Sequence, residues 1–175
     1  GDTFLSSMCN TITKLLKSYK PDDIFILAPS LKSGTPITML ANKLTSEGIK
    51  IFWGSNDSDK ELKEEHTRGK VVFTSFHKSK GRERKINIVY SCDESYYHFG
   101  NKDLSKEKCP EPIFVALTRG LEQLFMIHGH NAKNDNKKYR KLPFIRKSIK
   151  ELKDLPYCKV VKENDIQWSD LEYGN

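Results

Sequence analysis

The stretch that decides the fold of this chain is Val71-Val72-Phe73-Thr74-Ser75-Phe76-His77-Lys78-Ser79-Lys80-Gly81-Arg82-Glu83. Its first part is a strand-length apolar run, and hydroxyl, imidazole, ammonium, glycine and carboxylate groups follow directly. A strand that is apolar on both faces is typical of a parallel sheet covered by helices. Because ligands bind at the carboxyl ends of strands in such sheets, residues 75–83 are predicted to form a binding loop.

Strands and helices alternate along residues 1–131, which predicts an α/β domain built on a mostly parallel sheet with helices on both faces. Helical spacing predicts a helix at residues 3–19, one from Pro36 to a stop at Gly48, and one at residues 113–124. Polar stretches are expected to be turns or loops at residues 54–68, 77–84 and 92–110. For residues 54–68 a short helix is the alternative. Apolar runs predict strands at residues 24–28, 49–53, 70–74, 86–90 and 124–127.

The chain of 175 residues is long enough for one domain and a small appendage. Residues 132–175 are interpreted as a basic extension, with a helix predicted at 144–152 and a strand at 158–161. Since the chain starts without methionine, we expect it to be either a fragment of a longer protein or a processed product. No apolar run approaches the roughly 20 residues that cross a bilayer, so no membrane partner is expected.

A net charge of +7 favours an anionic partner, and nucleic acid is the commonest one. The alternative is that lysine serves only for solubility, because lysine far outnumbers arginine here. The four cysteines form no C-x-x-C pair and fit no zinc spacing, so no metal site is expected. Free thiols indicate a reducing, intracellular compartment, either cytoplasmic or nuclear.

The side chains of residues 75–83 suit a phosphorylated ligand. Ser75 and His77 alternate with apolar Phe76, so both can face the same side and donate hydrogen bonds to a phosphate oxygen. Gly81 permits a close backbone approach or a positive φ. Glu83 can accept hydrogen bonds from a ribose hydroxyl. A charged turn between two strands explains these residues equally well when they are taken alone.

A second stretch, Pro112-Ile113-Phe114-Val115-Ala116-Leu117-Thr118-Arg119-Gly120, places one charged residue in a strongly apolar helix. A buried guanidinium without a partner is costly, so Arg119 is expected to face either an internal carboxylate or an anion. A phosphate at a domain interface would suit its planar fork. Both partners remain open on this stretch alone.

Together the two stretches resemble motifs V and VI of the UvrD/Rep-like branch of superfamily 1 DNA helicases. Those patterns run approximately T-x-H-x-x-K-G-x-E and V-A-L-T-R-A, and residues 75–83 and 115–120 stand in the same order and spacing. The strand predicted at 86–90 lies between them, and the resemblance covers residues 20–130. It implies the second RecA-like motor domain of such an enzyme, without the half that carries the phosphate-binding P-loop.

The resemblance also implies which residues contact the nucleotide. Arg119 would be the catalytic arginine finger that reaches the γ-phosphate of ATP. Glu83 would contact the ribose, with Gly81 beside it in the ATP site. ATP and Mg²⁺ would be held mainly by the first motor domain, so the N-terminal RecA-like domain of the same longer chain is an expected partner.

The nucleic-acid contacts implied by the resemblance lie earlier in the same loop. Ser75 and His77 would touch the phosphate backbone of single-stranded DNA, and Lys80 would support the loop. The sequence departs from the pattern where Ser75 replaces threonine, Arg82 replaces an apolar residue and Gly120 replaces alanine, the last being interpreted as a mild change.

The expected parent is an ATP-dependent DNA helicase of DNA repair or replication, and this chain alone is expected to be inactive. Arg119 is expected to point out of its helix, toward the sheet edge that holds the turn with His77 and Glu83. A side chain locked in the core by a carboxylate, or placed on the opposite rim of the sheet, would count against the motor assignment. One alternative is a non-catalytic nucleic-acid-binding module with a degenerate helicase fold. Another is a scaffold whose basic tail docks a partner.

Overall fold

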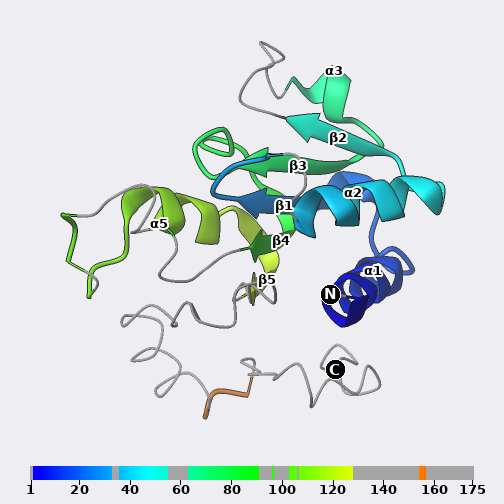
Figure 1. Ribbon diagram of the computed structural model, residues 1–175. Coiled ribbons are helices and arrows are strands. Elements are labelled where there is room, and N and C mark those ends of the chain that lie inside the picture. Colours follow the sequence, from blue (N-terminus) through cyan, green and yellow to red (C-terminus); the bar gives the residue numbers. More distant parts are fainter. Residues whose placement is uncertain are drawn as a thin grey trace.

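The computed structural model describes residues 2–32, 36–54, 63–90, 96, 103–105, 107–127 and 154–156. They contain a five-stranded sheet in the order β2-β3-β1-β4-β5, in which each neighbouring pair is parallel (Figure 1). The prediction of an α/β fold on a parallel sheet is therefore confirmed. The strands are β1 (Ile24–Ala28), β2 (Ile51–Gly54), β3 (Val71–Ser75), β4 (Arg84–Tyr90) and β5 (Gly120–Ile127).

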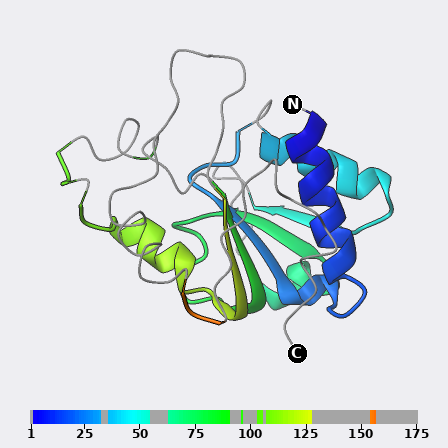
Figure 2. The same ribbon diagram turned by 90° about the horizontal axis from the view of Figure 1, so that it is seen from below.

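Helices cover both faces of the sheet. Figure 2 shows α1 (Asp2–Leu15) and α2 (Pro36–Ser46) on one face and α5 (Glu111–Leu117) on the other. Two short elements precede strands, the 3-10 turn η1 (Pro21–Asp23) and the helix α3 (Glu64–Thr67). The predicted arrangement of helices on both faces is therefore also confirmed.

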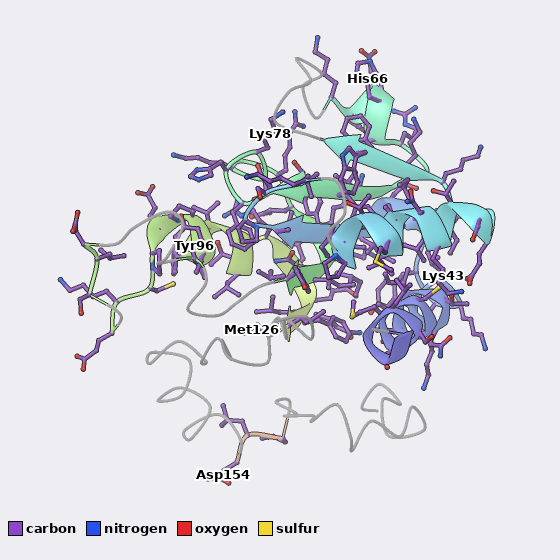
Figure 3. The ribbon with its side chains drawn as sticks, in the orientation of Figure 1. Lys43, His66, Lys78, Tyr96, Met126 and Asp154 are labelled. Carbon is purple, nitrogen blue, oxygen red and sulfur yellow. The ribbon has the colours of Figure 1, made fainter. Side chains whose placement is uncertain are left out.

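The strands β1 and β3 are buried at every position because each face of the sheet packs under a separate cluster of apolar side chains. Along β1, Ile24 and Ile26 enter the cluster beneath α1 and α2, while Phe25 and Leu27 enter the cluster beneath α5. Burying a large apolar side chain of this kind contributes about 1.5–3 kcal/mol. Side chains fill the space between the sheet and its helices, and Tyr96 lies beside α5 (Figure 3).

The prediction of a helix over residues 113–124 is wrong. The helix ends at Leu117, and Gly120 already begins β5 by pairing with Arg84. Leu121, Leu124 and Phe125 have helical spacing, but the hydrogen bonds available from the edge of β4 outweigh that local preference. As a result, Arg119 lies in the turn between α5 and β5 rather than within a helix.

The other boundaries differ less from expectation. α1 ends at Leu15 and continues as a turn, in which the Tyr19 N–H donates to the Leu15 carbonyl at 2.8 Å. Gly48 follows α2 with φ +80°, as a helix stop requires. Except for residues 154–156, the predicted extension 132–175 lies outside the described residues. Within the described part of the chain, no helix has the length and apolar character needed to cross a membrane.

Candidate functional site

The predicted site residues lie at the two opposite ends of the parallel strands. His77 follows the last residue of β3, so it lies at the carboxyl ends of the parallel strands, here called the carboxyl rim. Glu83 directly precedes β4, and Arg119 directly precedes β5, so both lie at the amino ends of the strands, here called the amino rim. The Arg84 N–H donates to the Arg119 carbonyl at 3.0 Å, which ties the two amino-rim segments together.

The expectation that Arg119 shares an edge with His77 is therefore wrong, whereas its sharing an edge with Glu83 is borne out. The reason is the direction of the strands. Because β3 and β4 both run parallel to β1, the chain must return from the carboxyl rim to the amino rim between them, over residues 76–83. The two ends of the binding loop thus face different edges of the domain.

The crossover segment, residues 76–83, is anchored at its start. The Phe76 ring is fully buried, and its N–H donates to the Ala28 carbonyl at 3.0 Å. The buried Ser79 hydroxyl donates to the Phe76 carbonyl at 2.7 Å. The Ser75 hydroxyl, which is 1% exposed, accepts the Lys78 N–H at 3.4 Å. The Ser75 side chain therefore supports the turn from inside, and the expectation that it faces the same side as the exposed His77 is wrong.

His77 and Lys80 are exposed and border a cavity of about 150 Å³ on the carboxyl side of the crossover. The remaining lining comes from the buried Phe76 and from Glu111, Pro112 and Val115 of α5. The imidazole and the ammonium can donate to a phosphate, and the apolar groups can contact a base or sugar, while Glu111 adds one carboxylate to the lining. Of the three residues assigned to the nucleic-acid-binding site, Ser75, His77 and Lys80, the last two are thus displayed together.

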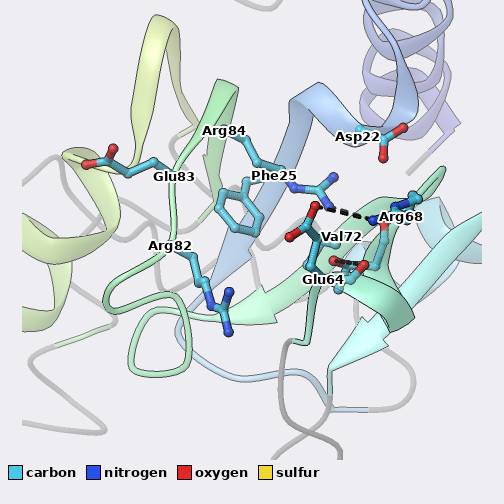
Figure 4. A pocket seen from close by; sticks show the side chains of 9 residues that line it. Asp22, Phe25, Glu64, Arg68, Val72, Arg82, Glu83 and Arg84 are labelled. Atoms are coloured by element: carbon cyan, nitrogen blue, oxygen red, sulfur yellow. Dashed lines mark hydrogen bonds and ion pairs between the residues drawn. The ribbon is translucent and has the colours of Figure 1, made fainter.

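The crossover reaches the amino rim through Gly81, whose φ of +78° lies in the left-handed region that glycine adopts at little cost. Arg82 and Glu83 follow as exposed residues. In Figure 4 the Glu83 side chain points away from the Arg84 guanidinium, which extends toward Asp22 and Arg68. Glu83 is accordingly open to a ligand outside the domain.

Arg119 is half-buried, and backbone and hydroxyl groups orient its guanidinium. Its Nε donates to the Val115 carbonyl at 3.0 Å, and one Nη donates to the Thr118 hydroxyl at 3.1 Å. Among the described residues, no carboxylate forms an ion pair with it. Of the two partners left open by the sequence, an internal carboxylate is therefore not found in this part of the chain.

Arg84 is the guanidinium that the sequence analysis missed. It donates to the carbonyls of Pro21, Ile24, Thr67 and Lys70 at 2.7–3.3 Å, and its Cζ lies 5.2 Å from the centre of the Phe25 ring. Burial lowers the pKa of Arg84, while the charges of nearby Asp22 and Asp23 raise it. The residue thus holds together the amino ends of β1, β3 and β4.

Arg84 also borders a cavity of about 300 Å³ on the amino rim (Figure 4). The charges of the residues that line this cavity balance, because three are arginines and three are carboxylates: Arg68, Arg82, Arg84, Asp22, Glu64 and Glu83. Glu64 and Arg68 pair with each other at 3.6 Å. Within the described residues, no group of three or more side chains is arranged to hold a metal ion, and so none at this cavity.

No protein-family model matches the sequence, and no curated protein is similar enough to count as a relative.

Proposed function

We propose that this chain is the second, RecA-like motor domain of an ATP-dependent superfamily 1 DNA helicase. The observation that carries the proposal is that Glu83 and Arg119 share the amino rim, whereas the placement of His77 on the opposite rim departs from the single shared edge that we expected. The residues that the resemblance assigns to the nucleotide, Glu83 and Arg119, share the amino rim, and those displayed for single-stranded DNA, His77 and Lys80, share the carboxyl rim. A protein that only bound nucleic acid would have no need to keep the first pair together.

Arg119 has the features that an arginine finger requires. Its guanidinium is fixed by Val115 and Thr118 and forms no ion pair with a described carboxylate. Such a group, held in place before the reaction, stabilises negative charge that develops on a transferring phosphoryl group. Arginine fingers contribute on the order of 10³–10⁵ in rate. ATP and Mg²⁺ would be bound mainly by the preceding motor domain, and Glu83 would accept a hydrogen bond from the ribose.

The carboxyl rim would contribute to the track for single-stranded DNA. His77 and Lys80 supply donors for backbone phosphates, and the net charge of +7 favours association with a polyanion. Residues 76–83 connect this track directly to Glu83, so one short segment would join the nucleic-acid and nucleotide contacts.

The test is the ATPase rate, with and without single-stranded DNA, of the longer enzyme that contains this chain. We expect Arg119→Ala to lower kcat by about 10³-fold or more with little change in KM for ATP. Arg68→Ala is the matched control, because Arg68 is an exposed arginine that pairs with Glu64. Equal rates for the two variants would contradict the proposal. DNA binding without any ATPase activity in the wild type would favour a non-catalytic binding module instead.

A further inference from the structure

Asn87 is a fully buried amide in β4, beside Phe25 of β1. Its Nδ2 donates to the Ala116 carbonyl in the last turn of α5. Its Oδ1 is buried and has no hydrogen-bond partner among the described residues. A buried acceptor without a partner is costly, so an apolar side chain would suit this place better unless the amide has a specific task.

The Ala116 carbonyl that Asn87 binds is the point from which the chain turns toward Arg119. The Arg119 N–H donates to the same carbonyl at 3.3 Å, and the Thr118 N–H does so as well. On its other side, the Arg119 carbonyl accepts the Arg84 N–H at 3.0 Å. Asn87 thus holds the acceptor that fixes the backbone of Arg119, one residue away from the carbonyl that holds its Nε.

Gly120 is required for this arrangement, although its replacement of alanine looks mild in sequence. A Cβ at position 120 would lie 2.8 Å from the Cβ of Asn87 and 2.9 Å from the Gln123 carbonyl oxygen. Carbon atoms do not approach this closely without displacement, so alanine would push the turn away from β4. Asn87 and Gly120 therefore form a matched pair across the two strands.

We propose that Asn87 is a positioning residue for Arg119 and acts through the Ala116 carbonyl. The close approach of residue 120 to Asn87 that this requires is possible only with glycine at position 120. Its catalytic consequence rests on the proposed function, whereas its effect on the Arg119 conformation does not. Without the amide, the end of α5 loses its side-chain bond to β4, the turn is held to β4 by the Arg84 N–H, and the direction of the guanidinium is less fixed.

The experiment measures Arg119 directly by NMR, as the rate of solvent exchange of its Nε–H in this chain. Asn87→Leu keeps the size of the side chain and removes the donor, so we expect it to speed exchange by about tenfold. Gly120→Ala is also expected to speed exchange, because the added Cβ would push the turn away from β4. Asn42→Leu, the same chemical change at an exposed position of α2, should leave the rate as in the wild type.

The second readout is the ATPase of the longer enzyme, where Asn87→Leu should lower kcat by roughly 10- to 100-fold without raising KM for ATP. A folded Asn87→Leu chain with unchanged Arg119 exchange would overturn the inference, whatever the ATPase rate. If Asn87→Leu does not fold, unchanged exchange in Gly120→Ala overturns it. Absence of ATPase in the wild type would defeat the proposed function while the exchange result still decides the positioning role.

Discussion

Replacing Arg84 with methionine tests whether one guanidinium holds the amino rim together. Methionine keeps an unbranched stem that can still pack against Phe25, but it donates no hydrogen bond to the carbonyls of Pro21, Ile24, Thr67 and Lys70. The substitution therefore separates the loss of charged hydrogen bonds from the loss of volume.

The magnitude follows from the number and setting of these bonds. Hydrogen bonds to a charged group contribute about 1.5–3 kcal/mol each, but three of the four share one nitrogen and do not add. The neighbouring cavity of about 300 Å³ also lets water reach some of the freed carbonyls. We therefore expect Arg84→Met to lower the free energy of unfolding by about 2–4 kcal/mol, below the upper range for breaking a fully buried charge pair.

Guanidinium chloride unfolding, followed by circular dichroism, measures this loss. Arg84→Lys should lie between the wild type and Arg84→Met, because an ammonium cannot serve four carbonyls with a fork. Arg82→Met is the control at an exposed arginine of the same cavity and should change stability by no more than about 0.5 kcal/mol. If Arg84→Met and Arg82→Met unfold at the same denaturant concentration, the role assigned to Arg84 is refuted.

Two further predictions concern nucleic acid and pH. Lys80→Ala should reduce the salt dependence of single-stranded DNA binding by about one unit in the log–log slope, measured by fluorescence anisotropy. Lys43→Ala, on the opposite face, should leave the slope unchanged, since Lys43 pairs with Glu47. Equal slopes for the Lys80→Ala and Lys43→Ala variants would count against a DNA track on the carboxyl rim. Burial, aided by the hydrogen bond to Glu47, raises the pKa of the Cys9 thiol, so its proton is held more tightly in the folded state. Stability present below about pH 8.5 should therefore be lost as the pH rises through the raised pKa. The unfolding midpoint should fall more between pH 7 and pH 10 in the wild type than in Cys9→Ala. An equal fall in the two proteins would contradict the role given to the Cys9 thiol.

The central sheet could be predicted from the sequence because its signal is local. In β1 and β3 the apolar residues form short continuous runs, which are typical of strands covered on both faces. The helical spacing of the apolar residues in α2 and the glycine that ends it, Gly48, are also signals within a few residues of the sequence. In contrast, residues 121–125 fit helical spacing as well as a strand, and only pairing with β4 decides between them.

The site was less predictable because it depends on the path of the chain between strands. The sequence indicates that polar residues follow β3, but it does not reveal that the chain returns across the sheet before Glu83. Arg84 stands among Arg82 and Lys85 in a basic run, so nothing local distinguishes it from a solvated arginine. Asn87 is one polar residue in an apolar strand, a signal that was present and could have been followed to α5.

The crossover between β3 and β4 has a mechanical consequence. A hinge at its start would have to expose the Phe76 ring and break the hydrogen bond to Ala28, and the strands at its two ends are both paired with β1. The two edges of this domain should therefore turn together as one rigid body. Any change in shape during a working cycle would then occur at the joint with a neighbouring domain, and a small rotation there would displace His77 and Lys80 by an amount set by the width of the sheet.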